Sequence, residues 1–439
     1  MKTKLLGLAL FIGLNIQAQD FDQAKMDSLF STIEINEKGM GSISIFKNGN
    51  EVYQNSIGFT SIEENIPLTN QTKFRIGSVS KTFTATIVMK LIEQGKISLD
   101  DKLGNYFPEI LNSETITIEH LLKHRSGIYN FTSAEDYVTW MEQPITRDEL
   151  VEKIVSHGSV FEPDEKTEYS NSNYVLLSFI IEDITGKNFS EILSDFITQP
   201  CKLNDTYLGS KINLSQNEAD SYTMLKDWKM STETDMSVPM GAGAIVSTPT
   251  DLNRFLYCLF NHQLISAESL DKMTNIQDGM GLGIFQVPFY DKKAFGHTGG
   301  IDGFQSNAFF FPKENISVAY LSNGVVMPMN DILIGVLSIY FGRDYDLPEF
   351  KEPLELSSEE LDKYLGVYSS LDFPLKLTIS IEDNILIGQG SGQPSFALEA
   401  YDKHKFKFDQ ASLKIEFIPN EDKLILQQGG GVFELTKEK

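Results

Sequence analysis

The amino-acid sequence predicts an α+β fold, an antiparallel sheet flanked by helices, followed by a small antiparallel β-barrel. Alternating segments open the chain, segments of helical period fill its middle, and alternation returns towards residue 321. Beyond an acidic, proline-containing stretch near residue 350 the period is two. Period two is typical of strands and period 3.6 of helices, so the 439 residues divide into a mixed layered part and an all-β C-terminal part.

The first 20 residues are typical of a secretory signal peptide. Lys2 and Lys4 precede the apolar run Leu5–Leu14, and cleavage is expected after Ala18. The run is shorter than the roughly 20 residues that cross a bilayer, no later stretch qualifies as a transmembrane segment, and no cysteine follows to carry a lipid. The mature protein is therefore expected to be soluble and exported, either periplasmic or secreted.

Composition and charge exclude several classes of protein. A hydrophobic fraction of 41% fits a globular chain, and a formal net charge of −24 disfavours a nucleic-acid partner, because phosphate binding needs a basic surface. Cys201 and Cys258 are the only cysteines. Two cysteines make no disulfide framework, and they argue against a thiolate metal site.

The first elements are a hairpin and a buried helix. Met40–Gly58 alternates on both sides of Asn48-Gly49, which favours a tight turn. Val79–Gln94 is apolar on most sides and ends at Gly95, so we expect a core helix. Further helices are predicted at Ile118–Lys123, Arg147–His157, Tyr174–Thr185 and Thr250–Phe260.

Strands return late in the chain. They are predicted at Gly283–Pro288, Ala294–His297, Gln305–Phe311 and Ile316–Leu321, before a final apolar segment, Ile332–Tyr340. The expected organisation is a mixed α+β domain over 22–342, a linker over 343–357 and a barrel over 358–439. Eight short strands are predicted for the barrel: Gly366–Ser369, Lys376–Ile381, Ile385–Gly388, Ala397–Tyr401, Lys405–Phe408, Leu413–Ile418, Lys423–Gln427 and Val432–Thr436.

Three Ser-x-x-Lys motifs are candidates for nucleophilic chemistry. Ser44 and Lys47 lie on an alternating strand, where positions i and i+3 point to opposite faces. Ser269 and Lys272 lie in a polar helical stretch, where the lysine is solvated and stays protonated. Ser78 and Lys81 open the buried helix, so both side chains share a face, and burial lowers the pKa of a lysine until it can act as a base. A structural hydrogen bond by Lys81 is the alternative.

Two further constellations carry candidate site residues. Tyr169-Ser170-Asn171 lies in a predicted polar loop before the Tyr174 helix, where a tyrosine can relay a proton and an amide can bind lysine or substrate. The alternative is a helix-capping turn. His297-Thr298-Gly299-Gly300 follows a predicted strand, where an exposed N–H could complete an oxyanion hole. The alternative there is a plain glycine-rich turn.

The order and spacing of these motifs resemble the serine β-lactamase and penicillin-binding-protein superfamily. The similar group contains class C β-lactamases, D-alanyl-D-alanine carboxypeptidases, D-aminopeptidases and family VIII esterases. Further segments over Asp22–Gly342 support the resemblance, namely Phe74–Ser78, Ile116–Gly127, Gly241-Ala242-Gly243 with Ser247-Thr248 and Asp251-Leu252, and Gly281-Leu282-Gly283. The resemblance implies a β-lactamase-like fold with a helical lobe beside the sheet and, at the C-terminus, a lipocalin-like barrel.

By matching position, the resemblance also implies roles. Ser78 would be acylated, Lys81 would be its partner base and Tyr169 would shuttle the proton, although which of the last two takes the first proton stays open. Asn171, His297, Thr298, Gly299 and Gly300 would bind substrate, with the N–H groups of Ser78 and Gly300 forming the oxyanion hole. No cofactor is needed.

His297 stands where many members of the family have lysine. Efficient class C β-lactamases usually carry a permanent cation there, so His297 favours a peptidase acting on D-amino acids, or an esterase, over a β-lactamase. Relatives with His-Thr-Gly that bind a peptide C-terminus often have a hydroxyl residue next, whereas this chain has Gly300, which disfavours carboxylate recognition.

Other functions are weighed beside this serine hydrolase. A β-lactamase, a slow penicillin-binding protein and a non-catalytic receptor for cell-wall peptides are the alternatives. His120 and His124 have a zinc-like spacing, but no glutamate lies between them, and the family match explains the stretch as scaffold, so no metal is expected. The expected partner is a small-molecule or peptide substrate. The sequence leaves the oligomeric state and the role of the barrel open.

Overall fold

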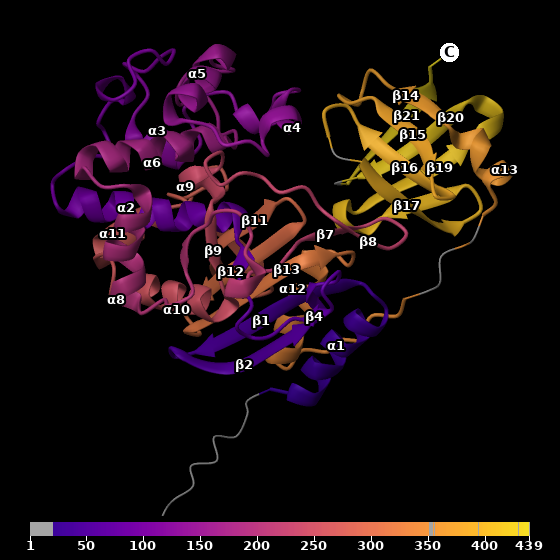
Figure 1. Cartoon of the computed structure of the whole chain (residues 1–439), viewed down its shortest axis with the longest axis horizontal. Helices are drawn as coiled ribbons and strands as arrows, with labels where there is room; N and C mark the ends of the chain where they lie inside the picture. The colour runs from indigo at the N-terminus through magenta and orange to yellow at the C-terminus, as the bar shows by residue number, and fades with distance from the viewer. Residues whose placement is uncertain (1–20, 351–353, 355, 394, 429, 439) are drawn as a thin grey trace, which may run out of the picture.

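The computed structural model describes residues 21–439 except 351–353, 355, 394, 429 and 439. The predicted signal peptide therefore lies outside the described residues. Figure 1 shows a larger body of sheet and helices and a smaller closed barrel. Within the described part of the chain, no helix combines the length and apolarity needed to cross a bilayer.

A six-stranded antiparallel sheet organises the larger body. Its order is β10-β11-β12-β13-β1-β2, so the first strand of the early hairpin, β1, pairs with β13, which comes about 270 residues later. The strands are β1 (Gly39–Lys47), β2 (Asn50–Ile57), β10 (Phe285–Phe289), β11 (Lys292–Ile301), β12 (Phe304–Phe311) and β13 (Ile316–Val325). The predicted hairpin is confirmed, with Asn48 and Gly49 both at positive φ in its turn.

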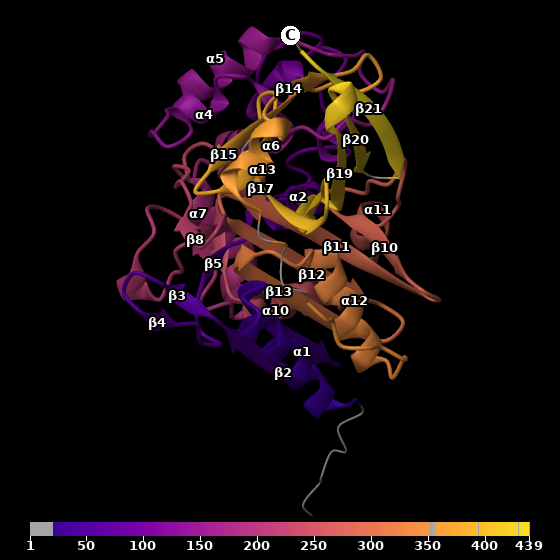
Figure 2. The same ribbon diagram turned by 90° about the vertical axis from the view of Figure 1, so that its right-hand side faces the viewer.

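Helices cover the two faces of this sheet and bury two separate apolar clusters. On one face, α1 (Gln23–Ile35) packs with α12 (Met329–Tyr340), as Figure 2 shows. On the other face lie α2 (Ser80–Glu93), α6 (Asn171–Thr185) and α10 (Pro249–Phe260). Consecutive strand residues point to opposite faces of the sheet. Phe309 therefore packs in the cluster beneath α1 and α12, and Phe310 in the cluster beneath α2, α6 and α10.

The remaining helices and short strands build a lobe beside the sheet. The helices are α3 (Ile118–Leu122), α4 (Tyr137–Trp140), α5 (Arg147–His157), α7 (Phe189–Leu193), α8 (Gln199–Cys201), α9 (Met240–Gly243) and α11 (Ala267–Met273). The single-turn segments are η1 (Gly77–Val79), η2 (Leu103–Asn105), η3 (Phe131–Ser133), η4 (Ser194–Thr198) and η5 (Leu214–Gln216). The short strands are β3 (Phe59–Ser61), β4 (Ile66–Pro67), β5 (Phe74–Arg75), β6 (Tyr207–Leu208), β7 (Tyr222–Met224), β8 (Trp228–Met230) and β9 (Ile245–Ser247).

The C-terminal barrel closes with eight antiparallel strands, as the alternation predicts. After α13 (Ser358–Leu361) and η6 (Asp362–Tyr364) come β14 (Gly366–Ser369), β15 (Leu377–Glu382), β16 (Ile385–Gly390), β17 (Ser395–Asp402), β18 (Lys405–Phe408), η7 (Asp409–Ala411), β19 (Leu413–Ile418), η8 (Pro419–Glu421), β20 (Lys423–Gln428) and β21 (Gly431–Lys437). Its interior is filled by buried side chains such as Tyr364, Phe406, Phe417 and Leu426.

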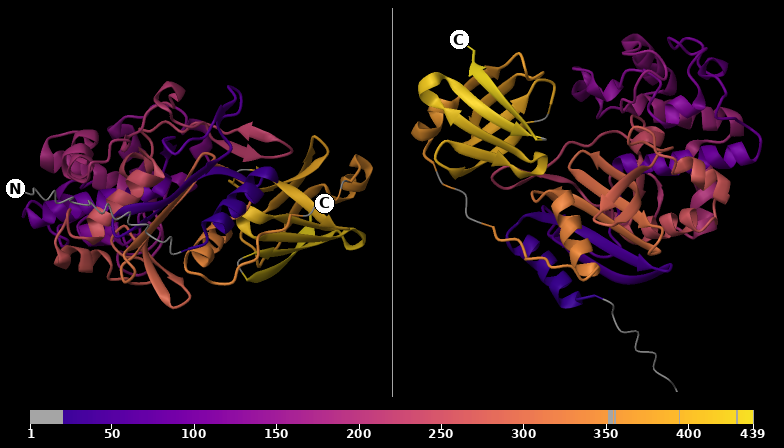
Figure 3. Two further views of the ribbon diagram at one scale, coloured as in Figure 1. Left: turned by 90° about the horizontal axis from the view of Figure 1, so that it is seen from below. Right: turned by 180° about the vertical axis from the view of Figure 1, so that it is seen from behind.

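The barrel contacts the larger body through a few polar groups. The Gln410 side chain donates to the Val325 carbonyl, and Lys38 Nζ lies 3.6 Å from a carboxylate oxygen of Glu399. Figure 3, seen from behind, shows the barrel beside the sheet and α12. The two bodies keep separate apolar clusters.

Three local predictions differ from the structure. Helix α6 begins at Asn171, so this residue lies in the first helical turn and not in a loop. Strand β11 continues to Ile301, so His297–Gly300 belong to a strand and not to a turn after it. Cys201 and Cys258 form one disulfide between α8 and α10, which the cysteine count does not predict.

Candidate active site

Ser78 lies on η1, the short turn that leads into α2. The turn is placed by Gly77, whose φ of +50° is accessible to glycine at little cost. A Cβ on Gly77 would come within 2.8 Å of the Gly300 backbone nitrogen, so only glycine lets η1 approach β11 this closely. Ser78 keeps partial exposure while its neighbours Gly77 and Val79 are buried.

Lys81, one turn into α2, is fully buried beneath Ser78. Its Nζ lies 2.9 Å from Ser78 Oγ, 2.8 Å from Asn171 Oδ1 and 2.7 Å from the Ala242 carbonyl oxygen. The amide and carbonyl oxygens can only accept hydrogen bonds, whereas the hydroxyl can also donate. A neutral amine, with two N–H groups and one lone pair, satisfies all three partners when Ser78 donates to it.

The buried environment favours that neutral amine. Desolvation lowers the pKa of Lys81 well below its ordinary value. No carboxylate is among the three hydrogen-bond partners of Nζ, so none of them compensates the cost of a buried ammonium. Lys81 is therefore suited to accept a proton from Ser78 at neutral pH.

Tyr169 completes the group around Ser78. Lys81 Nζ lies 4.9 Å from the centroid of its ring, and the Ser78 side chain lies close enough to the Tyr169 hydroxyl to influence its pKa. Desolvation raises the pKa of the Tyr169 hydroxyl far above its ordinary value, with the Ser78 hydrogen bond acting in the opposite direction. Tyr169 therefore stays protonated at neutral pH.

The His124 ring packs against the Tyr169 ring, a contact that the sequence did not predict. The two rings stack with centroids 4.3 Å apart and an interplanar angle of 27°. The Ser170 backbone N–H donates to His124 Nδ1 over 3.1 Å, which fixes the ring against the segment that carries Tyr169. Burial, with Lys81 and His297 nearby, lowers the pKa of His124 well below its ordinary value, so the ring is neutral.

Asn171 is held so that its oxygen faces Lys81. Its backbone N–H donates to Asn130 Oδ1 over 2.9 Å, and its Nδ2 donates to Thr132 Oγ1 over 3.0 Å. Because both groups are engaged by the loop at residues 130–132, Oδ1 remains for the lysine. Ser170, at the N-cap position of α6, makes no side-chain capping bond to the helix.

The glycine pair of β11 lies against the turn that carries Ser78. A Cβ on Gly299 would meet the Ile76 carbonyl oxygen at 2.1 Å and the Ser78 nitrogen at 3.0 Å. Strand β10 pairs with β11 only up to Gly296, so among the described residues the edge from His297 onwards has no partner strand on that side. The structure thus brings Gly299 and Gly300 together with Ser78, Lys81, Tyr169 and Asn171.

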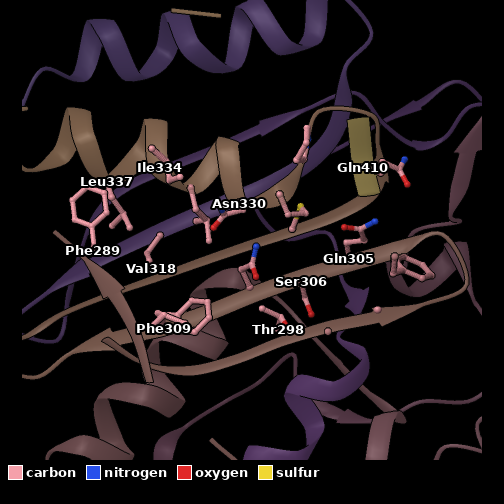
Figure 4. Close-up of a pocket in the computed structure, with 18 of the residues that line it drawn as sticks. Phe289, Thr298, Gln305, Ser306, Phe309, Val318, Asn330, Ile334, Leu337 and Gln410 are labelled. Atoms are coloured by element: carbon pink, nitrogen blue, oxygen red, sulfur yellow. The ribbon is translucent and has the colours of Figure 1, made fainter. Parts of the chain in front are cut away.

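His297 and Thr298 project to opposite faces of β11. The His297 ring is buried, 4.1 Å from the Phe285 ring and 6.3 Å from the Tyr169 ring, and burial followed by the proximity of Lys81 lowers its pKa to about 3. Thr298 instead borders a groove of about 800 Å³ against α12. Figure 4 shows Thr298 on the polar side of this groove and Phe289 and Leu337 at its apolar end.

An ion-pair cluster around the buried Arg75, which the sequence did not predict, links the turn that carries Ser78 to the end of β11. Arg75, three residues before Ser78, donates to Asp302 over 3.0 Å and to Glu233 over 2.7 Å. Asp302 also accepts from the Thr234 N–H and hydroxyl. Since Asp302 follows Gly300 by two residues, the cluster fixes the distance between β11 and the Ser78 turn. The only sequence signal is Arg75 within Phe74–Ser78.

The other candidate motifs have local structural partners. Ser44 Oγ donates to Glu51, and Lys272 forms an ion pair with Glu268 at the surface. His120 Nδ1 accepts from the Thr117 backbone N–H in a capping box. Across the residues that the structure describes, no group of three or more His, Cys, Asp or Glu side chains is arranged to hold a metal ion.

Comparison with known proteins gives consistent matches. Residues 35–335 match the family model described as Beta-lactamase. Penicillin-binding protein 4* of Bacillus subtilis (strain 168) is 26% identical over 94% of this chain and 98% of its own length. Teichoic acid D-alanine hydrolase of Staphylococcus aureus is 29% identical, over 54% of this chain and 57% of that protein.

A solved structure agrees with these sequence matches. D-amino acid amidase from Ochrobactrum anthropi SV3 is 25% identical, has a TM-score of 0.62 and covers 71% of this chain and 98% of its own. The predicted family and fold are confirmed. The chain belongs to the β-lactamase family, within the superfamily of serine β-lactamases and penicillin-binding proteins.

Proposed function

We propose that the protein is an exported serine hydrolase that cleaves an amide or ester bond next to a D-amino acid through an acyl-enzyme on Ser78. The observation that carries the proposal is the Lys81 geometry, with Nζ 2.9 Å from Ser78 Oγ and two acceptor-only partners on its other sides. The names of the similar proteins, a D-amino acid amidase and a D-alanine hydrolase, support the choice of substrate class.

In the proposed reaction, Lys81 Nζ takes the Ser78 hydroxyl proton as Oγ bonds to the substrate carbonyl carbon. The N–H groups of Ser78 and Gly300 stabilise the oxyanion. Collapse of the tetrahedral intermediate breaks the bond to the leaving group, which receives a proton relayed through the Tyr169 hydroxyl. Water then attacks the acyl carbon and gives up its proton to the same pair. The bond from the acyl carbon to Ser78 Oγ breaks, the pair returns the proton to Oγ, and the acid leaves.

Lys81 is favoured over Tyr169 as the acceptor of the first proton. Burial moves the pKa of the lysine down, towards its neutral form, and the pKa of the tyrosine up, towards its protonated form. Both shifts favour a neutral amine beside a protonated phenol. Because the two groups are close, they are expected to titrate as a pair.

Substrate-binding roles are proposed for Asn171, His297, Thr298, Gly299 and Gly300. Asn171 would act mainly by orienting Lys81, and the glycines by admitting the substrate backbone along the free edge of β11. Thr298 is the weakest member of this set, since it borders the groove on the α12 side.

Domain division and export are further parts of the proposal. Separate apolar clusters support a catalytic domain over 22–342 and a barrel over 358–439, joined by a linker at 343–357. The Cys201–Cys258 disulfide supports export, because such bonds persist in oxidising compartments. The packed interior of the barrel supports a structural role rather than a ligand site.

Hydrolysis of a short-chain nitrophenyl ester tests the proposed nucleophile. We expect turnover by the wild type and by Ser269→Ala, whose serine belongs to another Ser-x-x-Lys motif, but not by Ser78→Ala. Equal activity in all three would refute the proposal. Mass spectrometry after incubation with a penicillin separates the alternatives, since a stable adduct without ester turnover would indicate a slow penicillin-binding protein.

A further inference from the structure

We infer that His124 is a positioning residue for the proton relay, because it holds the segment that carries Tyr169 at three points. The inference rests on the proposed function and adds to it a residue that acts through Tyr169. Its basis is the set of contacts that His124 makes with three consecutive residues, 168–170.

Two backbone N–H groups flank Tyr169, and both donate to His124. The Glu168 N–H donates to the His124 carbonyl oxygen over 2.9 Å, and the Ser170 N–H donates to His124 Nδ1 over 3.1 Å. Nδ1 can accept this bond because burial lowers the pKa of His124 well below its ordinary value, which leaves the ring neutral. A single residue thus fixes the backbone on both sides of the tyrosine.

The third contact is made by the rings. The imidazole stacks on the phenol of Tyr169 with centroids 4.3 Å apart, which limits the movement of the phenol towards its buried side. The Tyr174 ring lies 5.2 Å from the same imidazole, and the Tyr174 hydroxyl donates to the Leu122 carbonyl oxygen over 2.8 Å. His124 is therefore anchored to both α3 and α6.

Asn173 fixes the orientation of the His124 ring. Its Oδ1 accepts from the Ser126 hydroxyl over 2.6 Å, and its Nδ2 lies 3.4 Å from His124 Nδ1. Because the amide oxygen is already bound, the amide presents N–H groups to Nδ1, which favours the tautomer with the ring proton on Nε2. All three side chains are buried, so the Nδ1 lone pair stays directed at the Ser170 N–H.

The position of Tyr169 matters because its hydroxyl relays a proton in the proposed reaction. A displacement of about 1 Å in a reacting group can lower a rate about 100-fold. His124 is only 2% exposed, so it offers little surface to a substrate. Loss of its contacts should therefore lower kcat and leave KM nearly unchanged.

Steady-state hydrolysis of nitrophenyl acetate tests the inference on the full-length protein. Glycine and asparagine both suit the φ of +56° at His124, but only asparagine keeps an acceptor near the position of Nδ1. We expect His124→Gly to lower kcat about tenfold with less than about a threefold change in KM, and His124→Asn to stay within about threefold of the wild type. His262→Gly is the matched control and should equal the wild type, because His262 also has a positive φ, +58°, but is exposed.

A double variant separates positioning of Tyr169 from general support of the fold. If His124 acts through the Tyr169 hydroxyl, adding His124→Gly to Tyr169→Phe should lower kcat by no more than about twofold, since the hydroxyl is already gone. Thermal unfolding verifies that the variants fold. His124→Phe, which keeps a ring and lacks the acceptor, replaces His124→Gly if the glycine variant does not fold.

Four results would overturn the inference. These are an unchanged kcat in His124→Gly, an effect carried mainly by KM, an equal loss in His124→Asn, and a further tenfold loss in the double variant. If Ser78→Ala keeps wild-type activity, the proposed function itself fails. If Tyr169→Phe keeps its kcat, the relay fails and the inference with it. If both of those variants lose activity and the His124 and Tyr169 effects are additive, only the further inference fails.

Discussion

Lys81→Met gives the most informative perturbation, because a buried neutral lysine has a thermodynamic signature besides its effect on activity. Burial lowers the pKa of the amine, and an amine that acts as the base must be deprotonated at neutral pH in the folded state, whereas in the unfolded chain it is protonated up to a pKa of about 10.4. The unfolded state therefore binds one more proton. The free energy of unfolding must then rise with pH, by about 1.4 kcal/mol per pH unit from this residue alone.

The free energy of unfolding rises with pH because the pKa of Lys81 is lowered in the folded state. A lowered lysine pKa destabilises the fold at low pH, and this cost disappears as the pH rises towards 10.4, where the unfolded chain also loses its proton. Lys81→Met removes the titrating group, so the difference in unfolding free energy between wild type and variant should change by about 1.4 kcal/mol per unit between pH 7 and 9.

Urea unfolding at several pH values measures this slope, with Lys272→Met as the matched control. Lys272 belongs to another Ser-x-x-Lys motif but lies at the surface, paired with Glu268. We expect the unfolding free energy of Lys272→Met to change with pH in parallel with that of the wild type. Lys81→Met should also lose at least about 1000-fold in esterase activity. Parallel curves for wild type and Lys81→Met would show that the lysine is charged in the folded protein, and would refute its assignment as the base.

Three further predictions concern the proton relay, the disulfide and the glycine pair. Tyr169→Phe should lower kcat about 100-fold with little change in KM, measured by steady-state ester hydrolysis; an unchanged kcat would remove Tyr169 from the relay. The double variant Cys201→Ser/Cys258→Ser should lose up to about 4 kcal/mol in urea unfolding, from the loop entropy of a 57-residue separation, and keep its activity; two titratable thiols in the wild type would contradict the disulfide. Gly299→Ala should remove most activity, because its Cβ would meet the Ile76 carbonyl oxygen at 2.1 Å, and full activity would show that β11 does not need this close approach.

Sequence patterns predicted much of the fold because alternation and helical period are local signals. All eight barrel strands were found this way, and the three Ser-x-x-Lys motifs were separated by the same reasoning. Ser44 lies on a strand and bonds Glu51, Lys272 is solvent-exposed, and only Lys81 is buried against its serine.

Features that depend on partners distant in the chain were missed. Strand β11 extends to Ile301 because β12 pairs with it from Phe295 to Ile301, although Gly299 and Gly300 lower its local strand propensity. The disulfide joins residues 57 positions apart, and no local pattern indicates their proximity. The contact between His124 and Tyr169 likewise forms only when the lobe folds.

The direct test of the central claim is to locate the acyl group during turnover. Acid quench of the reaction with nitrophenyl acetate, followed by digestion and mass spectrometry, should find one acetyl group on the peptide that contains Ser78. The adduct should be absent from Ser78→Ala and present in Ser269→Ala. An acetyl group on any other residue, or continued turnover with no adduct on the protein, would contradict an acyl-enzyme on Ser78.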